Sequence, residues 1–218
     1  MNRFWINIGL GVAAVILLIL VIPRLAGGEK TPIRALPYYM PTQSTAMNAD
    51  ASGKHIIRNF SFTDQTGKTV TNAYFKGKIT LVNFFFATCE GVCPVMNRQM
   101  NRVYNQYKSN NNVLFLSHTV NPENDSVSVL AAYAQRYNAD ASKWKFVTGN
   151  KTEIYNMART SYLLSDSEGD GSKEDFLHSD QIGLIDGEGH IRGRYTGTDA
   201  AEVDRLMIDL ELLLAEKK

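Results

Sequence analysis

Residues 79–87 form a nearly continuous run of β-branched, aromatic and other apolar side chains that leads directly toward two cysteines. Such a run is typical of a central strand that is buried on both faces. Cys89 and Cys93 follow it, and Pro94 suits the first turn of a helix, where its missing N–H costs nothing. The pattern therefore predicts a strand, a turn that carries two thiols, and a helix over residues 94–108.

The remaining patterns extend this unit into a layered α/β domain. The order of the expected elements predicts a central mixed sheet, with parallel strands and a final antiparallel hairpin, flanked by helices. Asp186-Gly187-Glu188-Gly189 is a strong signal for the turn of that hairpin. We expect further strands over residues 113–120, 145–148, 181–185 and 190–195, a short hairpin over 60–70, and helices from Asp125 or Ser126 to 137, from Asn150 or Thr152 to 162, and over 199–216.

The amino-terminal segment differs from the rest in being almost entirely apolar between residues 4 and 22. As a helix it would reach about 28 Å, close to the hydrocarbon thickness of a bilayer. This length favours one transmembrane helix over a cleaved signal peptide, the alternative that the small residues at 26–28 leave open. We expect an anchor over residues 1–23, a flexible tether over 24–54 and a folded domain over 55–218.

The charge of the chain bears on two questions, its binding partners and its membrane topology. The formal net charge of the 218 residues is +1 and no basic block is present, which argues against a nucleic-acid partner. Basic residues flank the apolar segment on both sides and lean weakly toward a cytoplasmic domain. A short amino-terminal anchor and a close pair of thiols favour the opposite topology. We therefore predict a single-pass protein of the bacterial cytoplasmic (inner) membrane, with its domain on the extracytoplasmic, periplasmic side.

Two thiols at the start of a helix are chemically active groups. The positive end of the helix dipole lowers the pKa of a nearby thiol, and the thiolate is both a nucleophile and a metal ligand. Cys89 and Cys93 could thus form a redox pair or bind a soft cation. A purely structural disulfide would close a loop of only three intervening residues and would stabilise the fold little.

His178 is the best candidate for a third participant at this site. It lies just before the expected strand 181–185, on the edge that faces the cysteine turn in thioredoxin-like folds. Such folds carry a cis-proline there, whereas this chain has no proline after Pro122. Two cysteines and a histidine suit copper, especially Cu(I). His118 is the competitor, with a packed and hydrogen-bonded side chain as its default interpretation.

Three motifs in this chain resemble those of the Sco/SenC family, which are thioredoxin-fold, copper-binding proteins that assist cytochrome c oxidase assembly. The resemblance covers residue 56 to the carboxyl terminus. It lies in C-x-x-x-C-P within residues 78–94, in residues 117–125, and in the histidine motif of residues 176–180 with the hairpin turn after it.

The resemblance implies that Cys89, Cys93 and His178 are ligands of copper, as Cu(I), Cu(II) or both. It also implies a metallochaperone, not an enzyme, that delivers copper to the dinuclear site of oxidase subunit II or reduces the thiols of that site. A copper donor and a thiol reductant would be further partners. Asn121 stands where the family has an aspartate, and Asp125 keeps the later acidic position; both, with His118, are candidates for tuning the ligands.

Two other functions stay open from the residues alone. A thiol–disulfide oxidoreductase would use one of the two cysteines as the attacking thiol and the other as the resolving one. A copper or redox sensor would signal through a change of conformation. The acidic loop of residues 165–175 has no glutamate at the last position of a calcium-binding register, so we expect it to be a solvated loop, to dock a partner or to close over the metal.

Overall fold

The computed structural model describes residues 35–40, 48–165 and 176–216. Within them a seven-stranded sheet has the order β2-β1-β5-β4-β3-β6-β7. β3 (Ile79–Phe85), β4 (Val113–Thr119) and β5 (Trp144–Thr148) are parallel neighbours. The other strands are antiparallel to their neighbours: β1 (Ser61–Asp64), β2 (Thr69–Thr71), β6 (Gln181–Ile185) and β7 (Ile191–Thr196). The predicted mixed α/β fold with a terminal hairpin is thus confirmed.

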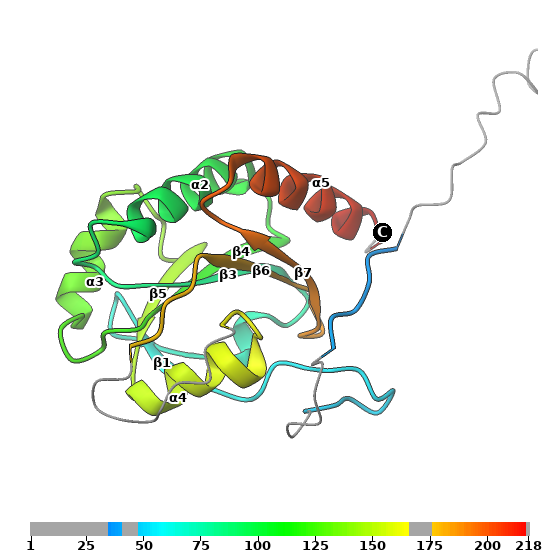
Figure 1. Ribbon diagram of the computed structural model, residues 1–218, viewed down its shortest axis with the longest axis horizontal. Coiled ribbons are helices and arrows are strands. Elements are labelled where there is room, and N and C mark those ends of the chain that lie inside the picture. Colours follow the sequence, from blue (N-terminus) through cyan, green and yellow to red (C-terminus); the bar gives the residue numbers. More distant parts are fainter. Residues whose placement is uncertain (1–34, 41–47, 166–175, 217–218) are drawn as a thin grey trace, which may run out of the picture. The chain divides into compact units, whose positions relative to one another are not determined.

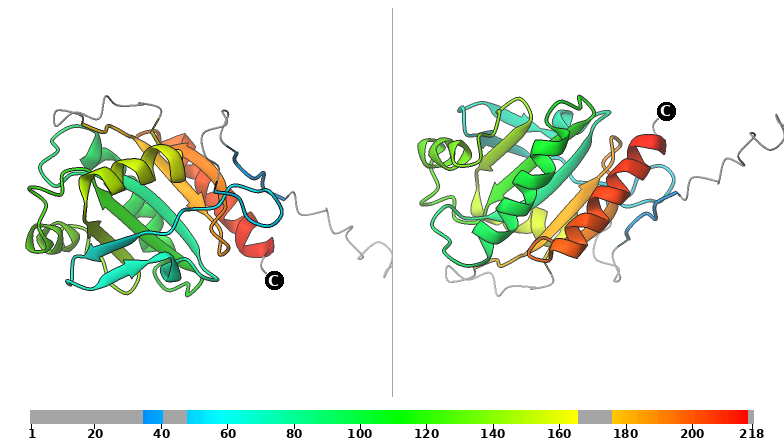
Figure 2. Two further views of the ribbon diagram at one scale, coloured as in Figure 1. Left: turned by 90° about the horizontal axis from the view of Figure 1, so that it is seen from below. Right: turned by 90° about the horizontal axis from the view of Figure 1, so that it is seen from above.

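Helices cover both faces of the sheet (Figures 1 and 2). α2 (Val92–Tyr107), α3 (Val127–Gln135) and α5 (Ala200–Glu216) pack on one face, together with side chains of β3 such as Leu81 and Phe85. The other face is covered by α4 (Lys151–Asn156), which continues as a π-helical segment, η2 (Met157–Ser161). A short 3-10 helix, η1 (Asn72–Tyr74), follows β2.

β3 is the central element because both of its faces are covered. All seven of its residues are buried, and its side chains alternate between the two cores. Phe84 belongs to the core under α4, and Phe85 belongs to the core under α2. The sequence of this strand is apolar at nearly every position because helices cover both of its faces.

Two local boundaries differ from the sequence expectation. β3 ends at Phe85, two residues before the end of the apolar run, and α2 begins at Val92, before Pro94. Cys93 therefore lies inside the first turn of the helix. Helix ends are the least constrained part of a sequence pattern, because one or two residues more or less leave the buried face unchanged.

The predicted transmembrane helix over residues 4–22 lies outside the described residues, as does most of the acidic loop at 165–175. Within the described ranges, no helix has the length and the apolar composition to cross a bilayer. The domain boundaries stay a prediction, but two parts of the expected tether make specific contacts with the domain. Residues 35–40 bind β7, and Asp50 binds His190 beside it.

Candidate metal centre

The carboxyl ends of the parallel strands bring the candidate ligands to one edge of the sheet. β3 runs toward this edge and continues into the cysteine turn. β6 is antiparallel to β3, with Ile182 opposite Asn83, so the residues before β6 lie beside the residues after β3. Counting four residues from each partner places His178 opposite Ala87. The topology thus explains why a histidine far along the chain lies at the same edge of the sheet as the cysteines.

The cysteine turn is short and leads directly into α2. The Cys89 N–H donates to the Phe86 carbonyl (3.2 Å), and the Cys93 N–H donates to the Cys89 sulfur (3.4 Å). Gly91 is the N-cap of α2 and offers no side-chain hydrogen bond to the first turn. Both thiols are free; Cys89 is half-buried, whereas Cys93 is only 3 % exposed. The Cys89 sulfur is therefore the outer one of a close pair.

The electrostatic setting of Cys93 contradicts the expectation that the helix start lowers its pKa. Burial raises the pKa of the Cys93 thiol to about 12, and its hydrogen bond to Cys89 adds to the rise. Removal of the thiolate from water outweighs the helix dipole, because desolvation acts on the whole charge and the dipole supplies only about half a charge. Cys93 is a protonated thiol in the metal-free protein.

A small cavity of about 10 Å³ joins His178 to Cys93. The His178 side chain itself is exposed, and its ring lies 5.1 Å from that of Phe176, which packs edge-on against Phe86. Cys89 does not line this cavity. Besides Cys93 and His178, the lining residues are Phe84, Phe85, Phe86, Val92, Val120, Leu177 and Ser179.

The three predicted ligands are only partly assembled. Among the residues that the structure describes, no group of three His, Cys, Asp or Glu side chains is arranged to hold a metal ion. The structure places the two cysteines together, and it places His178 on the same cavity as Cys93. The donor types fit a soft cation, and a complete three-ligand site requires His178 to move closer to the thiols.

Asp125 binds the backbone of the segment that leads into the cysteine turn. Its side chain is fully buried, and its Oδ2 accepts hydrogen bonds from the Ala87 N–H (3.0 Å) and from the Thr119 hydroxyl. Its Oδ1 is buried and has no hydrogen-bond partner in the described structure. The carboxylate thus joins Ala87, two residues before Cys89, to Thr119 at the end of β4.

Asn121 supports Asp125 through its backbone. Its carbonyl accepts the Asp125 N–H (2.9 Å), and its own N–H donates to the Thr119 hydroxyl oxygen (3.0 Å). The Asn121 side chain accepts a hydrogen bond from Asn124 at the surface (2.9 Å). Thr119 thus links both residues, although it is not among the site residues predicted from the sequence. Its position as the last residue of a parallel strand is the signal that identifies it.

His118 lies on the opposite face of the sheet from α2. It is fully buried, stacks on Phe84 (centroids 5.1 Å apart) and pairs its Nε2 with the Tyr162 hydroxyl (3.2 Å). Burial lowers the pKa of this imidazole to about 3. The packed interpretation of His118 is the one that this geometry supports.

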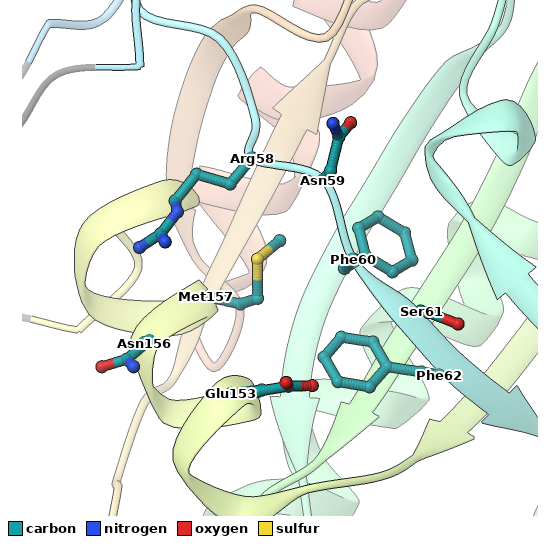
Figure 3. Close-up of a pocket in the computed structure, with 8 residues that line it drawn as sticks. All are labelled: Arg58, Asn59, Phe60, Ser61, Phe62, Glu153, Asn156 and Met157. Atoms are coloured by element: carbon teal, nitrogen blue, oxygen red, sulfur yellow. The ribbon is translucent and has the colours of Figure 1, made fainter.

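A larger cavity, of about 400 Å³, lies away from the thiols, between the segment that leads into β1 and α4. Figure 3 shows the rings of Phe60 and Phe62 beside Met157, with Arg58 and Glu153 at its rim. Its lining contains neither cysteine nor histidine. Its chemistry therefore does not match the soft-ligand pattern in the sequence.

The sequence of this chain is similar to a known protein family and to proteins in it. The SCO1/SenC family model matches residues 48–212. A SCO1 protein homolog from Bacillus subtilis is 29% identical over 157 residues, which is 71% of this chain and 81% of that protein.

Two solved structures share the fold. One is BsSco, described as a member of the Sco family of cytochrome c oxidase assembly proteins and studied for a disulfide switch; it has a TM-score of 0.62 and 28% identity, covering 72% of this chain and 92% of its own. The other is Arabidopsis thaliana ScoI with copper bound, with a TM-score of 0.57 and 22% identity over 72% of this chain and 98% of its own.

Proposed function

Because this chain belongs to the SCO1/SenC family, we propose that it is a membrane-tethered copper metallochaperone in which Cys89, Cys93 and His178 bind the metal. The observation that supports the proposal is that, at one edge of the sheet, the Cys93 N–H donates to the Cys89 sulfur and Cys93 shares a small cavity with His178. Copper is here the cargo. The protein would deliver this copper to the dinuclear copper site of cytochrome c oxidase subunit II, or reduce the thiols of that site. A copper donor and a thiol reductant would be further partners.

The residues suggest an order of events for metal uptake. Cys89 is the more exposed thiol, so it meets an incoming cation first. Cys93 is buried and protonated, so its coordination requires loss of a proton. Ligand exchange at this site therefore releases protons and becomes more favourable as the pH rises. His178, exposed and next to the cavity, completes the site by moving inward.

The surroundings of the ligands serve to hold them in place. Asp125 fixes the turn before Cys89, and the cavity walls are mainly aromatic and aliphatic side chains that limit the access of water. An apolar wall favours soft thiolate ligation, because hard oxygen donors from water are excluded. The membrane anchor over residues 1–23 and an extracytoplasmic domain belong to the same proposal.

Copper titration of the reduced protein tests the ligand set. His178→Ala should lower the copper affinity by on the order of a hundredfold and change the spectrum of the bound form. His178→Met, which keeps a soft donor, should retain more of the affinity than His178→Ala. Unchanged affinity and spectrum in His178→Ala would show that the three-ligand site is wrong.

A thiol–disulfide oxidoreductase is the second candidate, favoured by the contact between the Cys93 N–H and the Cys89 sulfur. The half-buried Cys89 would be the attacking thiol and the buried Cys93 the resolving one. In this case His178→Ala should leave the rate of disulfide exchange with a small dithiol nearly unchanged. A parallel loss of exchange and copper binding would argue against two separable functions.

A further inference from the structure

The first described residues of the chain cover the edge of the sheet that β7 forms. The Tyr39 N–H donates to the Ile191 carbonyl (2.9 Å), and Leu36 is buried in the core that β3, α2 and α5 share. Figure 1 shows this segment beside β7 and the last turns of α5. β7 is an outer strand of the sheet, and covering such an edge prevents unwanted pairing with other strands.

Arg192 on β7 is the centre of the contacts that hold this segment. Its side chain is 4 % exposed and donates from Nη2 to the Leu36 carbonyl (2.8 Å). The same guanidinium pairs with Glu216 at the end of α5 (2.8 Å) and with Asp186 in the hairpin turn (3.3 Å). Glu216 in turn accepts the Leu36 N–H (2.8 Å). One residue of the segment is therefore held through both its N–H and its carbonyl.

The ring of Tyr38 adds a second set of contacts. The guanidinium carbon of Arg192 lies 4.3 Å from the ring centroid, and the ammonium of Lys54 lies 3.9 Å from it. His190 meets the ring edge-on (centroids 5.2 Å apart) and lies between the carboxylates of Asp50 (2.9 Å) and Asp186 (3.3 Å). Residues 50–54 and 36–38 are thus tied to the same hairpin.

This cluster and the thiols lie at opposite ends of β3. The strand begins at Ile79, where the Gly77 N–H donates to the Gly187 carbonyl in the hairpin turn (2.9 Å). The cysteine turn follows Phe85 at the other end. Six residue steps of about 3.3 Å separate the two ends by about 20 Å. The amino-terminal part of the chain therefore joins the domain at the end away from Cys89 and Cys93.

We propose that residues 35–40 form an orienting strap, and that its docking surface consists of β7, the hairpin turn and the last turn of α5. The strap fixes the point where the preceding chain leaves the domain, at the end of β3 opposite the thiols. A partner domain then reaches the cysteines without displacing the attachment. The strap does not depend on copper; only its orientation toward a bilayer rests on the anchor in the proposed function.

Hydrogen exchange of the full chain tests the strap. Substitution Arg192→Gln should raise the exchange rate of the Leu36 and Tyr39 amides by about tenfold or more, because it removes the guanidinium that binds the Leu36 carbonyl and the Tyr38 ring. Arg205→Gln on the exposed side of α5 is the matched control and should leave these amides unchanged. Unprotected amides in the wild type, or equal protection in Arg192→Gln, would overturn the strap. If Arg192→Gln does not fold, Glu216→Gln serves in its place.

Energy transfer to the membrane tests the orientation. The full chain, with Cys89→Ser and Cys93→Ser, carries one donor dye at Val92→Cys or at Glu188→Cys; both sites are exposed, at opposite ends of β3. In vesicles with headgroup-labelled lipid, transfer should be higher from position 188 than from position 92, and Arg192→Gln should reduce the difference. Equal transfer in the wild type would overturn the orientation. No transfer from either position would contradict the anchor, and the exchange measurement would then decide the strap alone.

Discussion

The two ends of β3 carry similar kinds of side chain in opposite states. At the hairpin end, His190 and Arg192 are buried, and each meets at least two carboxylates. At the cysteine end, His178 is exposed, and one oxygen of the buried Asp125 has no partner in the described structure. At one end the buried charged groups are paired within the protein, and at the other the imidazole is exposed and a carboxylate oxygen is unpaired.

This difference separates a structural cluster from a site of exchange. A buried ion cluster with every partner present is rigid, since moving any member leaves another charge uncompensated. The proposed metallochaperone site must release its copper ion, so it cannot be closed in the same way. Substitutions at the hairpin end should therefore affect stability and leave copper binding unchanged, and substitutions of the ligands should do the reverse.

Arg192→Gln should have the largest effect on stability. It leaves Asp186 and Glu216 without their shared cation, and breaking a buried ion pair from one side costs about 3–5 kcal/mol. The measurement is the free energy of unfolding by urea, alongside copper titration of the folded variant. A loss below about 1 kcal/mol, or a copper affinity lowered as much as in His178→Ala, would remove the distinction between the two ends.

Asp125→Ala should come next and should be the exception that affects both properties. It leaves the Ala87 N–H and the Thr119 hydroxyl without their acceptor, at a cost of about 2–3 kcal/mol. The freed turn should also lower the copper affinity about tenfold. Asp125→Asn keeps an acceptor oxygen and should recover most of the affinity. If Asp125→Ala destabilised the fold but left copper binding unchanged, Asp125 would be a purely structural residue.

Particular residues show why the sequence predicts the cysteine end better than the hairpin end. Cys89, Cys93 and His178 carry distinctive chemistry at distinctive positions, and the parallel strands bring them to one edge. Arg192 and Glu216 look like ordinary charged residues in the sequence, because only the fold shows that both bind the backbone of Leu36 in the strap. The pKa of Cys93 was predicted in the wrong direction, since its helix position is visible in the sequence and its burial is not.

The pH dependence of stability tests the core between the two ends. Burial lowers the pKa of His118 to about 3, so between about pH 6.5 and pH 3 the unfolded chain binds a proton that the folded chain does not. Stability should therefore fall as the pH falls through this window, by about 1.4 kcal/mol per unit well below pH 6.5. His118→Gln should make the slope between pH 6 and pH 4.5 shallower. A slope equal to that of the wild type would show that His118 is not the group that titrates.

Asp64 adds to the acid sensitivity at lower pH. Burial alone would raise its pKa, but the hydrogen bonds from Lys145, Thr66 and Lys68 lower it to about 2. The stability that it contributes is complete above its unfolded value of about 4 and is lost between about pH 4 and pH 2. Asp64→Asn should therefore flatten the curve only below pH 4. This separate window distinguishes its effect from that of His118.

Cys89→Ser should have the smallest effect on stability and the clearest effect on function. The side chain is half-buried, and serine has nearly the same shape, so the free energy of unfolding of the metal-free protein should change by less than about 0.5 kcal/mol. Copper binding should be lost, because a neutral hydroxyl is a poor ligand for a soft cation. A loss of stability comparable to that of Asp125→Ala would mean that the Cys89 sulfur, which accepts the Cys93 N–H, is part of the framework of the turn. Loss of copper at nearly constant stability is the result expected of a residue kept for exchange, and Arg192 should show the opposite.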